Sequence, residues 1–102
     1  MLKLRRAENN PILEPVPEHW WESRYVYNAG AIEHDGKIHI LYRGEGVEPR
    51  PGGRGNKWPL ARLGLATSED GLQIDDRRED PVMGPTFVYN MWGVEDPRIV
   101  KM

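Results

Sequence analysis

The sequence predicts an all-β fold that corresponds to the first one to two blades of a β-propeller. Short stretches rich in β-branched and aromatic residues alternate with turns that contain Gly and Pro. Two segments also recur in the same order, because residues 10–15 resemble residues 80–85 and residues 26–28 resemble residues 88–90. With an inserted loop discounted, the repeat is about 50 residues long, which suits propeller blades. A closed propeller needs at least about four blades, so we expect an incomplete fold with little helix.

The chain is expected to form part of a single propeller domain over residues 1–102, with three segments. Residues 1–23 form an arm, because their prolines exclude a long helix. Residues 24–75 contain the strands of the first blade, interrupted by a loop at residues 44–59 that is rich in Gly and Pro. Residues 81–102 begin the next blade.

Three shorter segments complete the expected architecture. The aromatic patch at residues 19–22 is interpreted as a hydrophobic plug on the sheet edge, with an aromatic wall against a sugar or a base as the alternative. Residues 60–68 form a strand, and residues 72–75 begin the strand that pairs with it. The mixed charges of residues 77–80 predict a solvated loop.

A β-hairpin formed by residues 24–32 and 37–43 is the clearest unit of the sequence. The Asp-Gly pair at residues 35–36 is a favoured sequence for a two-residue type I′ turn. The register that this turn sets places Asn28 directly opposite Arg43, on the same face of the sheet. Two polar residues that face each other within apolar strands favour a binding site over a local hydrogen bond on a solvated face.

Composition and charge exclude several classes of function. A net charge of -2 argues against a nucleic-acid-binding surface. The absence of cysteine excludes disulfides and thiolate metal sites, and we expect no metal. No signal peptide or transmembrane stretch is recognisable, so we expect no membrane association and a cytoplasmic location. Open sheet edges predict that the chain associates readily, including as a homo-oligomer.

Residues 93–99 place Glu95, Asp96, Pro97 and Arg98 together between apolar neighbours. Such charges are costly to bury unless they are paired, and useful if they point into a cleft. The structural alternative is an Asx-type turn that opens a strand, with Asp96 bonded to nearby backbone. The same Glu-Asp-Pro tripeptide recurs at residues 79–81, so the tripeptide alone does not identify a site.

Several motifs, in order along most of the chain, resemble glycoside hydrolase family 130, the β-mannoside phosphorylases. The motifs occupy residues 10–15, 27–31, 41–43, 63–71, 81–83 and 93–99. The resemblance covers only the N-terminal part of a typical member. It implies a five-bladed propeller with its active site at the central axis, and inverting phosphorolysis of a β-mannosidic bond that gives α-mannose 1-phosphate.

The resemblance also implies roles for individual residues. Asp96 matches the catalytic acid of the family, which protonates the leaving oxygen through a sugar hydroxyl. Asn28 and Arg43 match residues that contact the sugar beside the scissile bond, and we add Glu95 and Arg98 as expected substrate-binding residues. The implied partners are a β-mannoside or a mannosyl-glucose type sugar and inorganic phosphate as co-substrate, with no cofactor.

A phosphorylase needs no catalytic base, because phosphate is already an anionic nucleophile, but it needs cationic groups to hold the phosphate. In the family these groups lie in later blades. The acid must stay protonated near neutral pH, so we expect burial or Glu95 to raise the pKa of Asp96. We expect Arg98 to pair with Glu95 or to pack as structure, rather than to pair with Asp96.

Two other classes of function remain open at this point. The chain could be a non-catalytic carbohydrate-binding remnant that keeps the sugar-facing residues without turnover. It could also belong to a β-mannosidase or to another five-bladed glycoside hydrolase, such as an arabinanase-like or fructosidase-like enzyme. Asp96→Asn would leave binding unchanged in the first case, and substrate choice would identify the second.

Overall fold

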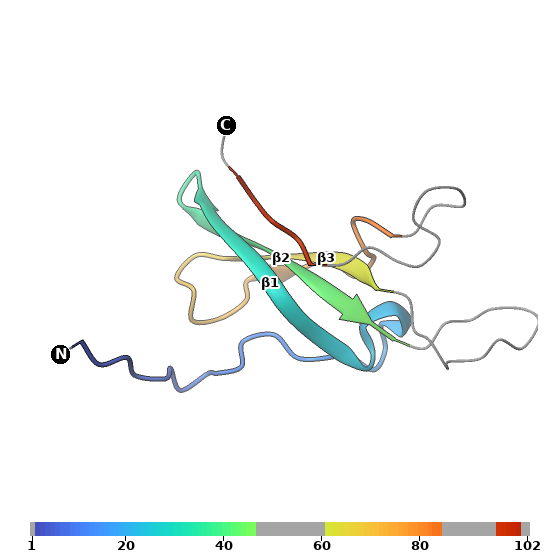
Figure 1. Cartoon of the computed structure of the whole chain (residues 1–102), viewed down its shortest axis with the longest axis horizontal. Helices are drawn as coiled ribbons and strands as arrows, with labels where there is room; N and C mark the ends of the chain where they lie inside the picture. Colours follow the sequence, from blue (N-terminus) through green and yellow to red (C-terminus); the bar gives the residue numbers. More distant parts are fainter. Residues whose placement is uncertain (1, 47–60, 85–95, 101–102) are drawn as a thin grey trace, which may run out of the picture.

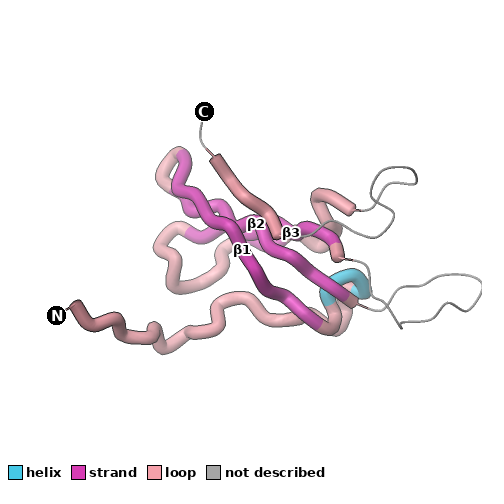
Figure 2. Tube along the Cα trace, viewed as in Figure 1, coloured by secondary structure: helices cyan, strands magenta, loops and turns pink. Residues whose placement is uncertain are grey.

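The computed structural model describes residues 2–46, 61–84 and 96–100. These residues form one antiparallel sheet in the strand order β1-β2-β3-β4 (Figure 1). The elements are the 3-10 helix η1 (Trp20–Glu22) and the strands β1 (Tyr25–His34), β2 (Lys37–Glu45), β3 (Arg62–Ser68) and β4 (Asp76–Arg77). Within this part of the chain, η1 contributes the only helical residues (Figure 2). The prediction of an all-β fold with little helix is therefore confirmed. No helix among the described residues has the length and apolar character needed to cross a membrane.

The hairpin of β1 and β2 forms where the sequence predicts it, except that β2 continues through Gly44 and Glu45. The predicted start of the loop at residue 44 is therefore wrong, and residues 47–59 of that loop lie outside the described residues. Asp35 and Gly36 have φ angles of 52° and 76°, as both central residues of a type I′ turn require. From the turn back to the pair Gly30 and Leu41, the register follows the prediction. The Asp-Gly signal thus defines the turn and the adjoining half of the hairpin correctly.

A β-bulge changes the register in the other half of the hairpin. The register shifts between Tyr27 and Gly30, so that Arg43 pairs with Tyr27. The prediction that Asn28 lies directly opposite Arg43 is therefore wrong by one residue. Asn28 has a φ of 51°, and Asn tolerates this left-handed conformation better than most residues do. Residues 28 and 29 together oppose Tyr42, as an extra residue in one strand does in a bulge.

Strand β3 matches the predicted strand at residues 60–68, but its partner begins later than expected. Residues 72–75 are turn and irregular structure, and β4 contains only Asp76 and Arg77. Asp70 Oδ1 accepts hydrogen bonds from the backbone N–H groups of Leu72, at 2.8 Å, and Gln73, at 3.2 Å. These bonds hold the segment in an Asx-type turn, which delays strand pairing.

The core lies on one face of the sheet and centres on Trp21 and Tyr42. Their rings are stacked with centroids 6.1 Å apart, and both side chains are buried. A Cβ atom at Gly64, the register partner of Tyr42, would overlap both rings, so this close packing requires glycine. Trp21 also donates from Nε1 to the backbone oxygen of Glu79, at 2.7 Å. The interpretation of this aromatic patch as a hydrophobic plug is confirmed for Trp21.

Glu22 is a buried carboxylate that joins the arm, β2 and β4. It accepts hydrogen bonds from Tyr42 Oη, at 2.8 Å, and from Arg77 Nη2, and its Oε2 lies 2.6 Å from His19 Nδ1. Arg77 Nη2 also donates to the backbone oxygen of Glu14, at 2.8 Å. The predicted solvated loop at residues 77–80 is therefore wrong for Arg77, because a buried carboxylate requires a cationic partner. Burial and the bond to Glu22 raise the pKa of Tyr42, which stays protonated.

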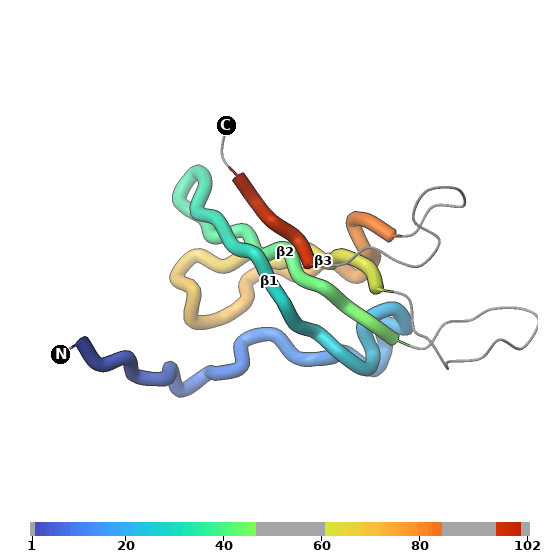
Figure 3. Tube along the Cα trace, viewed as in Figure 1, coloured from blue at the N-terminus to red at the C-terminus, as the bar shows by residue number. Residues whose placement is uncertain are grey.

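Residues 96–100 run along β1 in the direction of that strand (Figure 3). The backbone oxygen of Pro97 would lie 3.2 Å from a Cβ atom at Gly30, and Ile99 packs against the same glycine. Val100 lines a shallow cavity together with residues near the hairpin turn. The segment thus brings Asp96 to the bulged part of the hairpin.

Candidate functional site

Three segments that are distant in the sequence meet at Asp96. Asn28, in the bulge of β1, donates from Nδ2 to Asp96 Oδ1 at 3.1 Å. Arg43, on β2, donates from Nη1 to the same oxygen at 3.3 Å. The structure therefore brings together the predicted acid and the two predicted sugar contacts. It does so through the bulge, and not through the direct pairing of Asn28 with Arg43.

The alternation of side chains along β2 explains the position of this cluster. Ile40 and Tyr42 point to the core face, so Arg43 and Glu45 point to the opposite face. Counted from the turn without a bulge, Asn28 would oppose Arg43 and share its face. The bulge places Tyr27 opposite Arg43 instead, and Asn28, in a left-handed conformation beside Tyr27, donates its amide to Asp96.

Asp96 is ionised and accessible in this arrangement. Its side chain is 44% exposed. The hydrogen bond from Asn28, together with the hydrogen bond and charge of Arg43, holds the pKa of Asp96 below its usual value. The expectation of a raised pKa is therefore wrong for the described residues, because two donors stabilise the carboxylate and little burial opposes them. The hydroxyl groups of a sugar can donate hydrogen bonds to this exposed carboxylate and accept hydrogen bonds from the neighbouring amide and guanidinium.

Arg43 also contacts Glu45 and Tyr27. Its Nε and Nη2 donate to Glu45 Oε1, at 3.0 and 2.7 Å, and its guanidinium lies 4.8 Å from the ring centroid of Tyr27. Tyr27 Oη donates to the same Glu45 oxygen at 2.6 Å. Burial alone would lower the pKa of Arg43, but the hydrogen bonds to Glu45 and Asp96 raise it above its usual value. Arg43 is therefore a fixed cation with one edge directed at Asp96.

Of the two remaining predicted site residues, only Arg98 lies within the described residues. Glu95 lies outside the described residues. Arg98 donates from Nη1 to the backbone oxygen of the adjacent Pro97 at 3.0 Å, and the cation beside Asp96 is Arg43. Over the described ranges, no group of three or more potential metal ligands is found.

The family described as β-1,4-mannooligosaccharide phosphorylase has a sequence model that matches residues 3–102 of the chain. The chain belongs to glycoside hydrolase family 130. This membership confirms the family that the motifs at residues 27–31, 41–43 and 93–99 resemble.

Curated relatives of this family 130 chain come from Thermoanaerobacter sp. (strain X514). It is 36% identical to a β-1,2-mannobiose phosphorylase over 114 residues, which covers 100% of the chain and 34% of the relative. It is 38% identical to a 1,2-β-oligomannan phosphorylase over 102 residues, which covers 100% of the chain and 33% of the relative. The chain thus spans about a third of the length of the curated relatives it matches.

Solved structures of similar proteins support the same family and its fold. A glycosyl hydrolase from Bacteroides ovatus superposes with a TM-score of 0.73 at 31% identity, over 92% of the chain and 29% of that protein. A family 130 structure, from work describing glycoside hydrolases that target β-1,2-mannosidic linkages in Candida mannan, gives 0.72 at 34% identity with the same coverage. The four-stranded sheet is therefore part of the five-bladed propeller fold of family 130.

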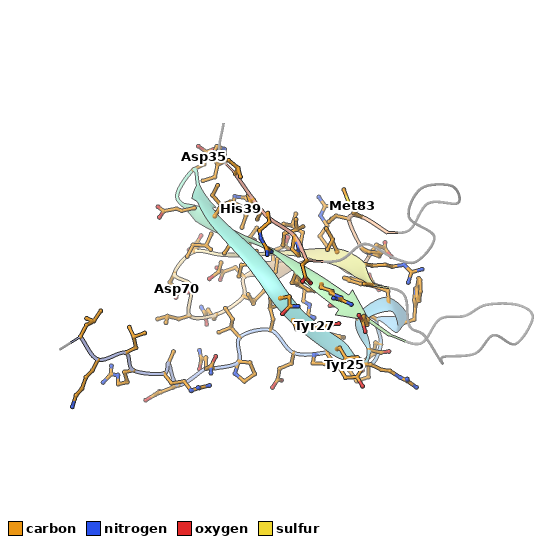
Figure 4. All side chains as sticks on the ribbon, viewed as in Figure 1. Tyr25, Tyr27, Asp35, His39, Asp70 and Met83 are labelled. Carbon is orange, nitrogen blue, oxygen red and sulfur yellow. The ribbon has the colours of Figure 1, made fainter. Side chains whose placement is uncertain are left out.

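Sequence reasoning missed Tyr27 and Glu45, which complete the surroundings of Arg43 in this family 130 chain (Figure 4 labels Tyr27 on β1). Glu45 follows Arg43 by two residues and therefore shares its face of β2, which was a usable signal. The role of Tyr27 could not be found in the same way, because its pairing with Arg43 depends on the bulge.

Proposed function

We propose that the protein is a glycoside phosphorylase that cleaves β-mannosides with inorganic phosphate, inverts the anomeric centre and releases α-mannose 1-phosphate. Membership of family 130 and the activities for which the two Thermoanaerobacter relatives are named support the substrate and the reaction. The single observation that carries the proposal is the convergence of Asn28 and Arg43 on one oxygen of Asp96.

In the proposed reaction, a phosphate oxygen forms a bond to the anomeric carbon while the glycosidic C–O bond breaks. The electron pair of that bond goes to the leaving oxygen, which takes a proton that originates on Asp96 and passes through a sugar hydroxyl. Asp96 is left as a carboxylate. Asn28 and Arg43 hold the mannose unit beside the scissile bond, so that the reacting atoms are fixed relative to the acid. Glu95 and Arg98 are proposed as further contacts to the substrate.

Substrate binding must also bring Asp96 into its acid form. In the free protein Asp96 is ionised, because Asn28 and Arg43 stabilise the carboxylate. A mannose unit that covers its exposed side chain would remove water and compete for these donors. Both changes raise the pKa of the carboxyl group. Binding of the sugar therefore favours the protonated form of Asp96, which donates the proton.

We propose a β-1,2-linked mannoside as the preferred substrate. Both curated relatives are named for β-1,2 linkages, and each is aligned over the whole chain. The family description names β-1,4-mannooligosaccharides, so β-1,4-mannobiose and a mannosyl-glucose are the appropriate competitors. The phosphate-binding cations are proposed to lie in the part of the relatives that the chain does not match.

The chain is proposed to supply the sugar half of the site. In this division, residues 1–23 form the arm, residues 24–75 the first blade, and residues 81–102 the start of the next blade. Strand β4 lies just beyond the proposed end of the first blade.

Hydrolysis is the second candidate, and one observation favours it. A solved relative at 34% identity is described in work on family members that are glycoside hydrolases acting on β-1,2-mannosidic linkages. In that reaction water replaces phosphate as the nucleophile, and a carboxylate base must activate it.

The test is to incubate the protein with each of the three disaccharides, with and without inorganic phosphate, and to measure the release of sugar. Phosphorolysis predicts turnover that requires phosphate and is fastest with β-1,2-mannobiose. Equal release of mannose without phosphate would establish hydrolysis. Binding of the disaccharide without any turnover would establish the carbohydrate-binding alternative.

A further inference from the structure

Glu45 is a carboxylate beside the candidate site that the proposed function does not use. One of its oxygens, Oε1, accepts three hydrogen bonds: from Tyr27 Oη at 2.6 Å, from Arg43 Nη2 at 2.7 Å and from Arg43 Nε at 3.0 Å. A carboxylate that receives both Nε and Nη2 of one arginine holds the whole edge of the guanidinium. Because that group is planar and rigid, the direction of its remaining nitrogen, Nη1, is then fixed as well.

Burial makes Glu45 the dominant partner of Arg43. The side chain of Glu45 is 11% exposed, whereas the side chain of Asp96 is 44% exposed. The ion pair of Arg43 with Glu45 measures 2.7 Å, and the pair with Asp96 measures 3.3 Å. A buried, shorter, charge-assisted contact is the stronger of the two. Arg43 therefore keeps its orientation when Asp96 gains a proton or when a ligand occupies the site.

We propose that Glu45, supported by Tyr27, is a positioning residue that fixes the guanidinium of Arg43 with its Nη1 directed at Asp96. The effect of Glu45 on catalysis rests on the proposed function, whereas its effect on the orientation of Arg43 does not. Glu45 acts through Arg43 and does not itself contact the reacting atoms.

Glu45 also balances the charge of Arg43. Without Glu45, Arg43 would stabilise the Asp96 carboxylate more strongly and oppose its protonation. With Glu45 in place, both Glu45 and Asp96 pair with the positive charge of Arg43. Removal of the negative charge leaves Asp96 as the remaining carboxylate partner of Arg43 among the described residues. The pKa of Asp96, the proposed proton donor, would then be lower, and less of it would carry the proton.

The test compares Glu45→Gln with Glu33→Gln, a matched change at an exposed glutamate on β1. In Glu45→Gln, kcat/KM for β-1,2-mannobiose is expected to fall by about 10- to 100-fold, as for a misplaced binding group. The limb of the pH profile that reports loss of the acid is expected to move down by about one pH unit. Glu33→Gln is expected to change neither quantity. A Glu45→Gln protein that loses stability but keeps the wild-type pH profile would overturn the inference.

Two further variants keep the test decisive if Glu45→Gln does not fold. Glu45→Asp retains the charge, so the pH limb is expected to return toward its wild-type position even if stability is reduced. Tyr27→Phe removes one of the three donors and is expected to give a smaller shift in the same direction as Glu45→Gln. A Tyr27→Phe pH profile equal to wild type, together with a Glu45→Asp profile that is shifted down by the full pH unit expected for Glu45→Gln, would contradict a positioning role.

A measurement that does not depend on turnover distinguishes this inference from the proposed function. NMR titration of the Asp96 carboxyl carbon and of the Arg43 Nε–H signal follows the geometry directly. We expect the Asp96 midpoint to fall by about one pH unit in Glu45→Gln and the Arg43 Nε–H signal to exchange faster with water. If the wild-type protein turns over no mannoside but shows these shifts, the proposed function fails and the positioning role stands. If the protein is active and neither signal changes, the positioning role fails alone.

Discussion

Asn28 and Arg43 are not register partners in the hairpin, yet both donate to Oδ1 of Asp96, at 3.1 and 3.3 Å. The bulge in β1 pairs Tyr27 with Arg43 and holds Asn28 in a left-handed conformation, from which its amide reaches Asp96. The candidate site therefore depends on a backbone irregularity as much as on side-chain identity.

Substitutions of Asn28 can separate its backbone role from its side-chain role. Asn28→Gly keeps the left-handed conformation available and removes only the amide. We expect it to fold and to bind β-mannoside about tenfold more weakly, the effect of one lost hydrogen bond. Asn28→Ala loses the same amide and is expected to be less stable than Asn28→Gly by about 1–2 kcal/mol, because alanine is strained at this φ angle. Urea unfolding and sugar titration of both variants measure the two effects, and equal stability of the variants would contradict the strained bulge.

Replacement of the proposed acid should slow turnover strongly and preserve the sugar site. Asp96→Asn removes the proton donor and leaves an amide oxygen to accept hydrogen bonds from Asn28 and Arg43. We expect kcat to fall by about 10²- to 10⁴-fold, with little change in affinity for the disaccharide. Asp80→Asn is the matched control, because Asp80 is exposed and belongs to the second Glu-Asp-Pro tripeptide. A similar loss in both variants would show that the effect is not specific to the site.

The pH dependence follows from the lowered pKa of Asp96 in the free protein. The donor form then exists only at acidic pH, so kcat/KM is expected to fall as pH rises from about 5 to 8. A bound sugar that raises this pKa moves the corresponding limb of kcat to higher pH. By linkage, the disaccharide binds the protonated form more tightly, and its affinity should rise as pH falls. Coincident limbs for kcat and kcat/KM would mean that sugar binding does not act on Asp96.

The buried carboxylate of Glu22 predicts a large effect on stability that is unrelated to chemistry. Glu22→Gln leaves Arg77 and Tyr42 without their anionic partner on the core face. We expect a loss of about 3 kcal/mol in the free energy of unfolding, as for a broken buried ion pair. Glu14→Gln is the control and should stay within about 0.5 kcal/mol of wild type, because Arg77 contacts only the backbone oxygen of Glu14. Chemical denaturation measures both values, and a near-neutral Glu22→Gln would contradict the described network.

Local signals account for the parts of the structure that were predicted correctly. The Asp-Gly pair at residues 35–36 determines the turn by its own conformational preference, and the all-β class follows from the strand-forming stretches around it. The motif match also selected Asn28, Arg43 and Asp96, which the structure brings together.

Tertiary effects explain what the sequence could not reveal. The bulge at Asn28 moves the register by one residue, and a register counted from the turn cannot include it. Arg77 lies in a charged run that looks solvated, but its partner, Glu22, is distant in the sequence and buried. The lowered pKa of Asp96 likewise reflects neighbours that only the folded chain supplies.

The configuration of the first product formed from β-1,2-mannobiose and inorganic phosphate tests the central claim most directly. Proton NMR of the reaction during the first turnovers identifies the anomeric form of the sugar phosphate, and that of any free mannose before it mutarotates. The proposed function predicts α-mannose 1-phosphate, formed only with phosphate and far more slowly by Asp96→Asn. Mannose formed at the same rate without phosphate, or a β-configured sugar phosphate, would contradict inverting phosphorolysis by this protein.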